Sequence, residues 1–489
     1  MKIPDKATAY RALESHDARF DGLIYVGVKS TGIYCRPVCP ARTPKFEHCT
    51  FYESAAAAQE AGFRPCLRCR PETAPQLASW RGTSNTVSRA LALINDGALD
   101  AEDSNVAALA ERLGVGDRQL RRLFLQHLGA SPIAVVQTRR VLFAKQLIHD
   151  TDLPMTEVAL AAGFNSLRRF NEVFQQLFQR APSALRRKAS VLSTESGTML
   201  RVRYRPPYDW DSMLGFLAAR AISGVEVIKN GIYRRTLEID GRFGTVAVKH
   251  LPRRQSLGIT IQFANVQALP VIVNRVRRVF DLNADISTID EHLSRDPQLA
   301  PYVLQRPGLR APGGWDGFEL AMRAVLGQQV SVAAARRLAG TLVSLHGTTL
   351  PEEMQQEGLT HAFPSAKQLA EAPSLGLGMP AARLKTLKAV AQAAVNDANL
   401  FQTMGSVEDA VARLQAITGV GEWTAQYIAM RAMREVDAFP ASDIGLLRGI
   451  AKVTKTSMTA KELLQHAERW RPWRAYAAQH LWAADGELK

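Results

Sequence analysis

The spacing of hydrophobic positions changes along the chain and predicts several separate folding regions. Between residues 106 and 180, apolar side chains recur at helical spacing and are interrupted by turns at Gly114 and at 162–165. From residue 200 the pattern alternates, which predicts strands at 200–204, 236–239, 244–248 and 258–261, with helices between the first two and after the last. Beyond residue 285 the pattern is helical to the end of the chain. We therefore expect a multidomain, mainly α fold with one small α+β lobe at 200–285.

Two helical pairs in the middle of the chain have the form of helix-turn-helix units. They occupy residues 106–128 and 155–180, and the second helix of each pair opens with polar and arginine side chains. Such side chains suit the edges of bases in a DNA major groove, and the candidates are Arg118, Arg121, Arg168 and Arg169. The alternative is two ordinary helical hairpins with solvated basic faces.

The charge of the chain favours a polyanionic partner. Its 489 residues carry a net charge of +15 with an isoelectric point near 9.8. Residues 1–200 contain 26 basic and 19 acidic side chains, a balance of +7 that leaves +8 for the rest, so both halves are basic. A solubilising excess of charge is the alternative. No apolar run approaches the roughly 18 residues of a membrane span, and the first residues lack a signal-peptide core, so we expect a cytoplasmic protein without a membrane partner.

Four cysteines near the N-terminus have the spacing of a zinc site. Three residues separate Cys35 from Cys39, two separate Cys66 from Cys69, and 26 separate the pairs. Each short-spaced pair fits one turn, and two pairs supply the four thiolates of a tetrahedral zinc ion. An iron site or free thiols are the alternatives. Cys49 lies outside both pairs and is expected to be a buried free thiol.

A glycine hairpin near the C-terminus carries the strongest chemical signal. The run 414–425 places Gly419 and Gly421 between two helical patterns, where backbone N–H groups at a helix start can bind an anion. If the anion is a DNA phosphate, the hairpin and Thr424 contact DNA, and Asp443 can reach the sugar–base bond of an extruded nucleotide. Alternatively, Ser442 or Asp443 simply caps the helix that follows.

The cysteine region resembles the N-terminal domain of the adaptive-response regulator Ada, over about residues 1–80, which implies a second small α+β domain that binds zinc. The run 30–42 carries the first cysteine pair and the run 61–69 carries the second. The resemblance implies that Cys35 accepts a methyl group irreversibly from a methylated DNA phosphate, whereas a purely structural zinc site is the alternative. Because a thioether lacks the thiolate charge, methylation should raise the affinity for DNA.

The helical pairs, with the run 181–187 that follows them, resemble the AraC family DNA-binding domain over about residues 85–190. This resemblance implies transcription control. The Ser- and Thr-rich segment 188–198 is expected to be a linker.

The C-terminal part resembles the alkylated-base glycosylase AlkA over about residues 200–489, with a helix-hairpin-helix domain at 286–489. The runs that carry the resemblance are 206–210, 213–221, 306–310, 326–333 and 470–477. It implies that Asp443 is the catalytic aspartate for hydrolysing the N-glycosidic bond of bases such as 3-methyladenine and 7-methylguanine. The aromatic side chains expected to stack on the extruded base are Trp423, Tyr427, Trp482 and Phe216. For each of them an ordinary core position is the alternative.

Three departures refine this expectation. Related glycosylases that also cut the backbone carry a lysine where this chain has Trp423, and an indole cannot form an imine. We therefore expect base release without strand cleavage. Gln329 is expected to contact DNA, but it occupies the position where some members have an apolar wedge, so the identity of the wedge residue stays open. No Pro-Cys-His-Arg motif occurs and no cysteine follows Cys69, so reversal of O6-methylguanine is not expected.

The combined prediction is a monomeric sensor, regulator and repair enzyme for DNA alkylation damage. Its expected partners are damaged duplex DNA, promoter DNA and RNA polymerase, and its expected cofactor is one zinc ion. A methylation-triggered activator with a vestigial glycosylase half is the second hypothesis. A zinc-stabilised DNA-binding scaffold without chemistry is the third.

Overall fold

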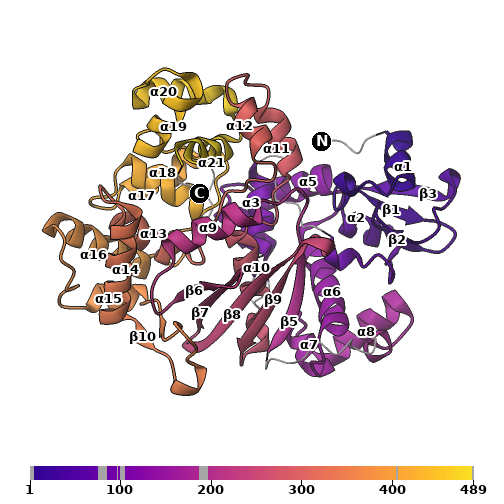
Figure 1. The fold of residues 1–489 in the computed structure, drawn as a ribbon. Coiled ribbons are helices and arrows are strands. Elements are labelled where there is room, and N and C mark those ends of the chain that lie inside the picture. The colour runs from indigo at the N-terminus through magenta and orange to yellow at the C-terminus, as the bar shows by residue number, and fades with distance from the viewer. Residues whose placement is uncertain are drawn as a thin grey trace. The chain divides into compact units, whose positions relative to one another are not determined.

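The computed structural model describes residues 5–74, 85–95, 97–99, 105–186, 197–402 and 406–486. The chain forms two compact units (Figure 1). The first comprises residues 1–205, 251–274 and 282–284, and the second comprises 206–250, 275–281 and 285–489. Among the described residues, no helix is long and apolar enough to cross a membrane.

The first unit begins with a small sheet that positions the cysteine pairs. Helix α1 (Lys6–Glu14) precedes four strands in the order β3-β1-β2-β4, namely β1 (Tyr25–Val28), β2 (Ile33–Cys35), β3 (Cys49–Tyr52) and β4 (Arg64–Pro65). Strand β1 is antiparallel to β2 and β3, whereas β2 and β4 run parallel. Helix α2 (Ala55–Glu60) starts at Ser54, whose hydroxyl accepts from Ala57 N at 3.0 Å. Because β2 and β4 are neighbours, Cys35 at the end of one lies beside Cys66, just after the other.

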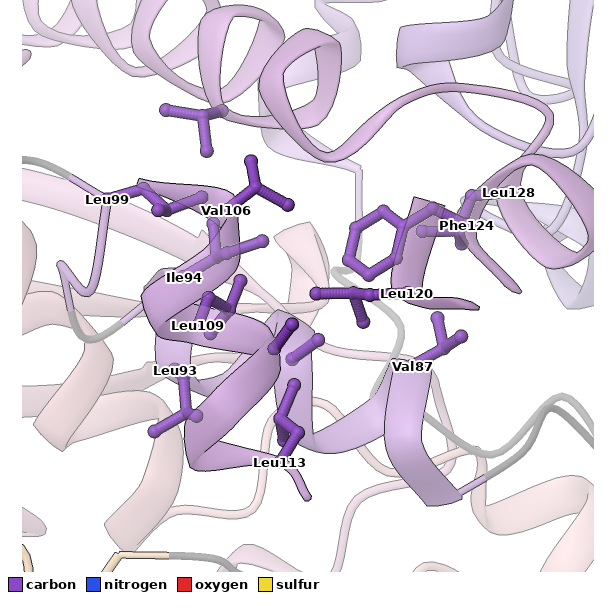
Figure 2. Close-up of a cluster of buried hydrophobic side chains, with 13 residues drawn as sticks. Val87, Leu93, Ile94, Leu99, Val106, Leu109, Leu113, Leu120, Phe124 and Leu128 are labelled. Carbon is purple, nitrogen blue, oxygen red and sulfur yellow. The ribbon is translucent and has the colours of Figure 1, made fainter. Parts of the chain in front are cut away.

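The middle of the chain folds into helices. They are α3 (Asn85–Asn95), α4 (Val106–Arg112), α5 (Asp117–Leu128), α6 (Pro132–Asp150), α7 (Met155–Ala161) and α8 (Leu167–Phe178). The predicted helical pairs at 106–128 and 155–180 are α4 with α5 and α7 with α8. A buried apolar cluster joins α3, α4 and α5 (Figure 2). Gly114 and Gly163 make the turns at left-handed φ values of 68° and 79°, which disfavour larger residues. The predicted linker lies outside the described residues up to residue 196.

Strands of the predicted α+β lobe follow in both units. In the first unit β5 (Thr198–Arg203) pairs antiparallel with β9 (Ser256–Phe263), and α10 (Leu269–Val279) begins there. In the second unit α9 (Trp210–Arg220) leads into β6 (Glu226–Lys229), β7 (Ile232–Ile239) and β8 (Arg242–Leu251), and β7 is antiparallel to both neighbours. The four predicted strands are present, and β6 is an additional strand that the alternation did not reveal.

The rest of the second unit is mainly helical. Its helices are α11 (Ile286–Leu293), α12 (Ala300–Gln305), α13 (Gly317–Leu326), α14 (Val332–His346), α15 (Ala366–Glu371), α16 (Ala381–Asn396), α17 (Val407–Gln415), α18 (Glu422–Arg431), α19 (Ile444–Thr454), α20 (Ala460–His466) and α21 (Arg474–Asp485). The prediction of helix throughout is wrong at β10 (Thr348–Thr349) and β11 (His361–Ala362). There the backbone bonds to the strand region instead, since Thr360 N donates to Gly224 O and Thr236 Oγ1 donates to His361 O.

Candidate functional site

The glycine hairpin between α17 and α18 has the predicted form. Gly419 adopts a φ of 83°, and a Cβ there would overlap the side chain of Thr386. Gly421 is the N-cap residue of α18, and its Cα faces open space. Gln328 Nε2 donates to Thr424 Oγ1 at 2.9 Å and to Gly419 O at 3.4 Å. These two hydrogen bonds connect the hairpin to the end of α13 and hold it in place. Glycine therefore permits both the tight turn and an unobstructed approach of an anion to the start of α18.

Asp443 is held by two indole groups and by the helix that it begins. Its Oδ2 accepts from Trp423 Nε1 at 2.8 Å, and its Oδ1 accepts from Trp482 Nε1 at 2.9 Å. Oδ1 also accepts from Leu446 N at 3.1 Å, which caps α19. Charge-assisted bonds of this kind fix the direction of a carboxylate. One free lone-pair position remains on Oδ2 for a water molecule or a sugar.

These residues line a cavity of about 1070 Å³ that is large enough for an extruded nucleotide. All four predicted aromatic side chains contribute to its wall, together with Gln329, Gly419 and Gly421. Trp423 and Tyr427 stack with ring centroids 5.3 Å apart, and Phe216 is 8% exposed. Gln329 is exposed at the cavity and has a left-handed backbone conformation with φ of 55°. Thr424 is buried, and its hydroxyl accepts the hydrogen bond from Gln328 that stabilises the hairpin.

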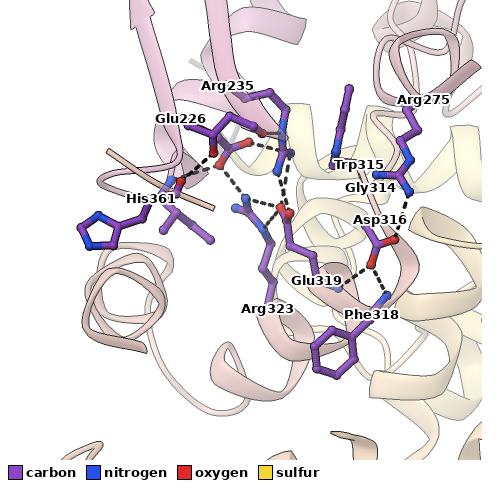
Figure 3. Close-up of polar contacts among 12 residues, drawn as sticks. Glu226, Arg235, Arg275, Gly314, Trp315, Asp316, Phe318, Glu319, Arg323 and His361 are labelled. Atoms are coloured by element: carbon purple, nitrogen blue, oxygen red, sulfur yellow. Dashed lines mark hydrogen bonds and ion pairs between the residues drawn. The ribbon is translucent and has the colours of Figure 1, made fainter. Parts of the chain in front are cut away.

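A buried ion network forms another part of the wall (Figure 3). Arg235 pairs with Glu319 at 2.7 Å, and Arg323 pairs with Glu226 at 2.5 Å and with Glu319 at 2.7 Å. Burial alone would raise the pKa of Glu319, but the two guanidinium groups outweigh it and bring the pKa to about 2. The two arginines of this network are therefore neutralised by two carboxylates.

The four predicted zinc ligands come together in the first unit. The sulfur atoms of Cys35, Cys39, Cys66 and Cys69 all lie within 4.8 Å of one another. Four thiolates bound to one zinc ion at about 2.3 Å place their sulfurs about 3.8 Å apart, so the cluster fits the ion. Backbone N–H groups of Arg36 and Arg68 donate to Cys69 and Cys66 sulfurs at 3.4 Å. Cys35 is the partly exposed member, whereas the other three are buried.

Helix α6 reaches this cluster through a buried lysine. Lys145 is fully buried, and its ammonium group donates to Cys66 O at 2.9 Å and to Glu72 at 2.7 Å. Arg70 bridges Glu72 and Asp150, the last residue of α6, at 3.0 and 2.9 Å. Burial raises the pKa of Glu72, but Lys145 and Arg70 oppose it more strongly and the pKa is lowered. Ion pairs and a hydrogen bond from Lys145 therefore connect α6 to the segment that carries Cys66 and Glu72.

The basic side chains predicted to read DNA lie on exposed helix surfaces. Arg118 and Arg121 are on α5, and Arg168 and Arg169 are on α8. Arg121 pairs with Asp117 at 3.0 Å, and Arg168 pairs with Glu172 at 2.8 Å. Such exposed pairs are weak, so these guanidinium groups can exchange a carboxylate for a phosphate or a base edge.

Sequence reasoning missed three side chains of the cavity region. Gln328 secures the hairpin, and Arg431 and Gln479 bond to each other at 3.2 Å in the interior. Arg431 lies one helical turn beyond Tyr427, on a helix whose buried positions are otherwise mostly apolar. An arginine at a buried position of this helix was the feature of the sequence that could have indicated its place in the cavity wall.

The second unit contains a helix-hairpin-helix motif whose aspartate lines a cavity, and the first unit contains a four-cysteine module, which is the arrangement of a DNA repair protein with several modules. Family models match residues 8–72 (metal binding domain of Ada), 109–188 (helix-turn-helix domain) and 199–316 (AlkA N-terminal domain). The 3-methyladenine DNA-glycosylase of Archaeoglobus fulgidus has a similar fold, with a TM-score of 0.52 at 20% identity over 58% of this chain and 98% of that one.

Two relatives extend the comparison to the sequence. The probable bifunctional transcriptional activator/DNA repair enzyme AlkA of Mycobacterium tuberculosis is 41% identical over 483 residues, 98% of this chain and 96% of that protein. DNA-3-methyladenine glycosylase 2 of Escherichia coli is 35% identical over 291 residues, 59% of this chain and 98% of that protein. The chain belongs to the family of AlkA-type bifunctional transcriptional activators and DNA repair enzymes.

Proposed function

We propose that this protein repairs DNA alkylation damage and controls the response to it. The C-terminal part is a DNA-3-methyladenine glycosylase of the type found in its relatives, and the N-terminal part is an Ada-like zinc module fused to a DNA-binding regulator. The observation that carries the glycosylase is the Asp443 carboxylate, held by two indole N–H groups in the wall of a nucleotide-sized cavity.

The proposed reaction is hydrolysis of the bond between the base and the sugar. As the C1′–N bond breaks, its electron pair leaves with the base and positive charge develops on the sugar. The Asp443 carboxylate stabilises that charge and orients the water that attacks C1′. Trp423 stands where a backbone-cleaving enzyme would need a lysine, so the product is an abasic site.

A base-release assay tests this reaction. Duplex DNA treated with a methylating agent should lose free 3-methyladenine in the presence of the protein. Asp443→Asn should reduce the rate by roughly 100-fold or more, because an amide cannot stabilise the developing cation. Undiminished release by this variant would exclude Asp443 from the chemistry. DNA binding by the variant serves as the control for folding.

Methyl transfer to Cys35 is the second proposed reaction. The Cys35 sulfur attacks the methyl carbon of a phosphate methyl ester, an S–C bond forms, and the C–O bond breaks with its electron pair going to the phosphate. Zinc, when bound, keeps the thiolate deprotonated at neutral pH. The partial exposure of Cys35 supports this assignment. Mass spectrometry should find one added methyl group on Cys35 after exposure to methylated DNA, and none in Cys35→Ala.

We also propose the remaining assignments that rest on the sequence alone. The modules occupy residues 1–80, 85–190, 200–285 and 286–489, and the four arginines of α5 and α8 contact promoter DNA. We further propose that the protein is a monomer, that it acts in the cytoplasm, and that it contacts RNA polymerase. The intact hairpin and the held Asp443 favour an active enzyme over a regulator with a vestigial glycosylase half.

A further inference from the structure

One arginine lies among the aromatic side chains that form the wall of the cavity. The guanidinium carbon of Arg431 is 4.7 Å from the ring centroid of Phe216, 5.2 Å from that of Trp482 and 5.6 Å from that of Tyr427. On the Phe216 ring a second guanidinium, that of Arg220, lies 3.9 Å from the centroid. The rings that would receive an extruded base are therefore already in contact with positive charge.

No carboxylate among the described residues forms an ion pair with Arg431. The residue is 2% exposed, and within the described part of the chain its hydrogen bonds go to neutral groups, which include Pro312 O at 2.8 Å and Gln479 Oε1 at 3.2 Å. Its Nε–H is buried without a hydrogen-bond partner, and none of the ion pairs found among the described residues includes it. Arg235 and Arg323, in the same wall, differ in having Glu226 and Glu319 as partners (Figure 3).

Burial lowers the pKa of Arg431 to about 10, so the group remains a cation at neutral pH. A cation in a site with little water acts more strongly on a nearby charge than it would at the surface. Four aromatic rings alone would predict a preference for cationic bases, through contact with their electron-rich faces. The buried guanidinium acts in the opposite direction.

We propose that Arg431 is a specificity-determining residue, whose buried charge lowers the activity of the cavity towards bases with a formal positive charge relative to its activity towards uncharged damaged bases. This inference rests on the proposed glycosylase activity. Both kinds of base remain substrates, and Arg431 sets their ranking.

Charge balance explains how one residue can rank the two classes. A departing base gains the electron pair of the C1′–N bond in either case, so a cationic base becomes neutral and an uncharged base becomes an anion that takes a proton from water. From free protein to transition state, Arg431 therefore repels the cationic base and attracts the uncharged one. Between the bound state and the transition state, however, either base gains negative charge, so Arg431 assists the departure of both kinds of base. Removal of the charge should lower kcat for both bases, but should lower KM only for the cationic base.

The test compares two duplexes, one with a single 7-methylguanine, which is cationic in DNA, and one with a single hypoxanthine, which is uncharged. Arg431→Met removes the charge and keeps most of the volume. We expect it to raise the ratio of kcat/KM values, 7-methylguanine over hypoxanthine, by at least about tenfold relative to the unmodified protein. Arg431→Lys keeps the charge, and its ratio should stay within about threefold. Arg295→Met is the matched control, because it removes one positive charge from an exposed site paired with Glu291.

A purely structural role for Arg431 would lower both activities without moving the ratio, and that outcome would overturn the proposal. An equal shift in Arg431→Lys or in Arg295→Met would also overturn it. Should the Arg431 variants fail to fold in a melting experiment, Arg220→Met decides the question, since this side chain is partly exposed. It should raise the ratio by about threefold, and no change would refute the electrostatic explanation. If the unmodified protein releases neither base, the proposed glycosylase fails instead.

Discussion

The geometry of Asp443 is compatible with both interpretations of its place in the sequence, the helix cap and the proposed catalytic carboxylate. Its position before a helix predicts an N-cap, and its position after a glycine hairpin predicts a catalytic carboxylate. In the structure Oδ1 caps α19 through Leu446 N, while among the described residues Oδ2 bonds to Trp423 alone. The cap fixes the carboxylate at the helix start, and the two indoles fix its direction.

The two tryptophans that hold Asp443 can be tested singly. Trp482→Phe and Trp423→Phe keep an aromatic ring but remove the N–H donor to the carboxylate. Each should lower the rate of base release by about tenfold or more, because a hydrogen bond to a charged group contributes about 1.5–3 kcal/mol. Single-turnover kinetics on a methylated duplex measures the effect. Affinity for a duplex with an abasic site is the control, and unchanged kinetics would mean that the indoles only pack against the base.

At the scale of elements, helix α6 depends on a buried charge for its contact with the cysteine module. Lys145 and Arg70 surround Glu72, and Lys145 also bonds to the carbonyl of Cys66. An interior ion group of this kind is costly to break, since the remaining partner stays buried without its counter-charge.

Lys145→Met should therefore destabilise the first unit by about 3 kcal/mol. It should also speed the loss of zinc to a chelator, because the backbone beside Cys66 loses its donor. Denaturant unfolding and a colorimetric zinc-release assay measure the two effects. Lys29→Met, at an exposed lysine, should change neither. Equal zinc retention in both variants would show that α6 does not support the cluster.

The ion network of the cavity wall predicts a pH dependence. Arg235 and Arg323 hold the pKa of Glu319 at about 2, below its ordinary value. Stability from this carboxylate is therefore complete above about pH 4.5 and is lost as the pH falls towards about 2. Glu319→Gln should melt lower than the unmodified protein at pH 7, and the difference should shrink as the pH falls below about 4.5. A difference in melting temperature that is constant over this range would contradict the assignment.

At the scale of the whole molecule, two kinds of repair chemistry are combined with a DNA-binding regulator. Transfer of a methyl group to Cys35 removes one negative charge from the cysteine cluster. The methylated protein should therefore bind duplex DNA more tightly, and the gain should diminish as salt is added, because salt screens the interaction. Titration of labelled DNA at two salt concentrations measures this.

Cys35→Ala provides the control for that measurement, since its DNA affinity should not respond to prior exposure to methylated DNA. Asp443→Asn should respond as the unmodified protein does, because it removes only the base-release chemistry. An affinity that is indifferent to methylation of Cys35 would argue against a charge-driven switch.

The sequence by itself determined the fold classes, the four zinc ligands, the glycine hairpin and the candidate aspartate. These features depend on short-range spacing: two cysteines on one turn, glycines at a tight bend, and apolar side chains at helical or alternating intervals. Such patterns are local, so they can be read before the chain is folded. The sequence did not predict the short strand β6 or the pair β10–β11. These strands form because of the segments they pair with, and their own residues carry no clear alternating pattern.

Only the tertiary structure decided what surrounds each of those residues. Trp423 and Trp482 are 59 positions apart in the sequence, yet both donate to Asp443. Arg431 contacts rings from three helices and lacks a carboxylate partner among the described residues, which no local pattern could reveal. Burial, and the presence or absence of a counter-charge, arise from contacts between distant segments. They determine whether a charged side chain is a surface group, half of an ion pair, or an unneutralised cation in a binding cavity.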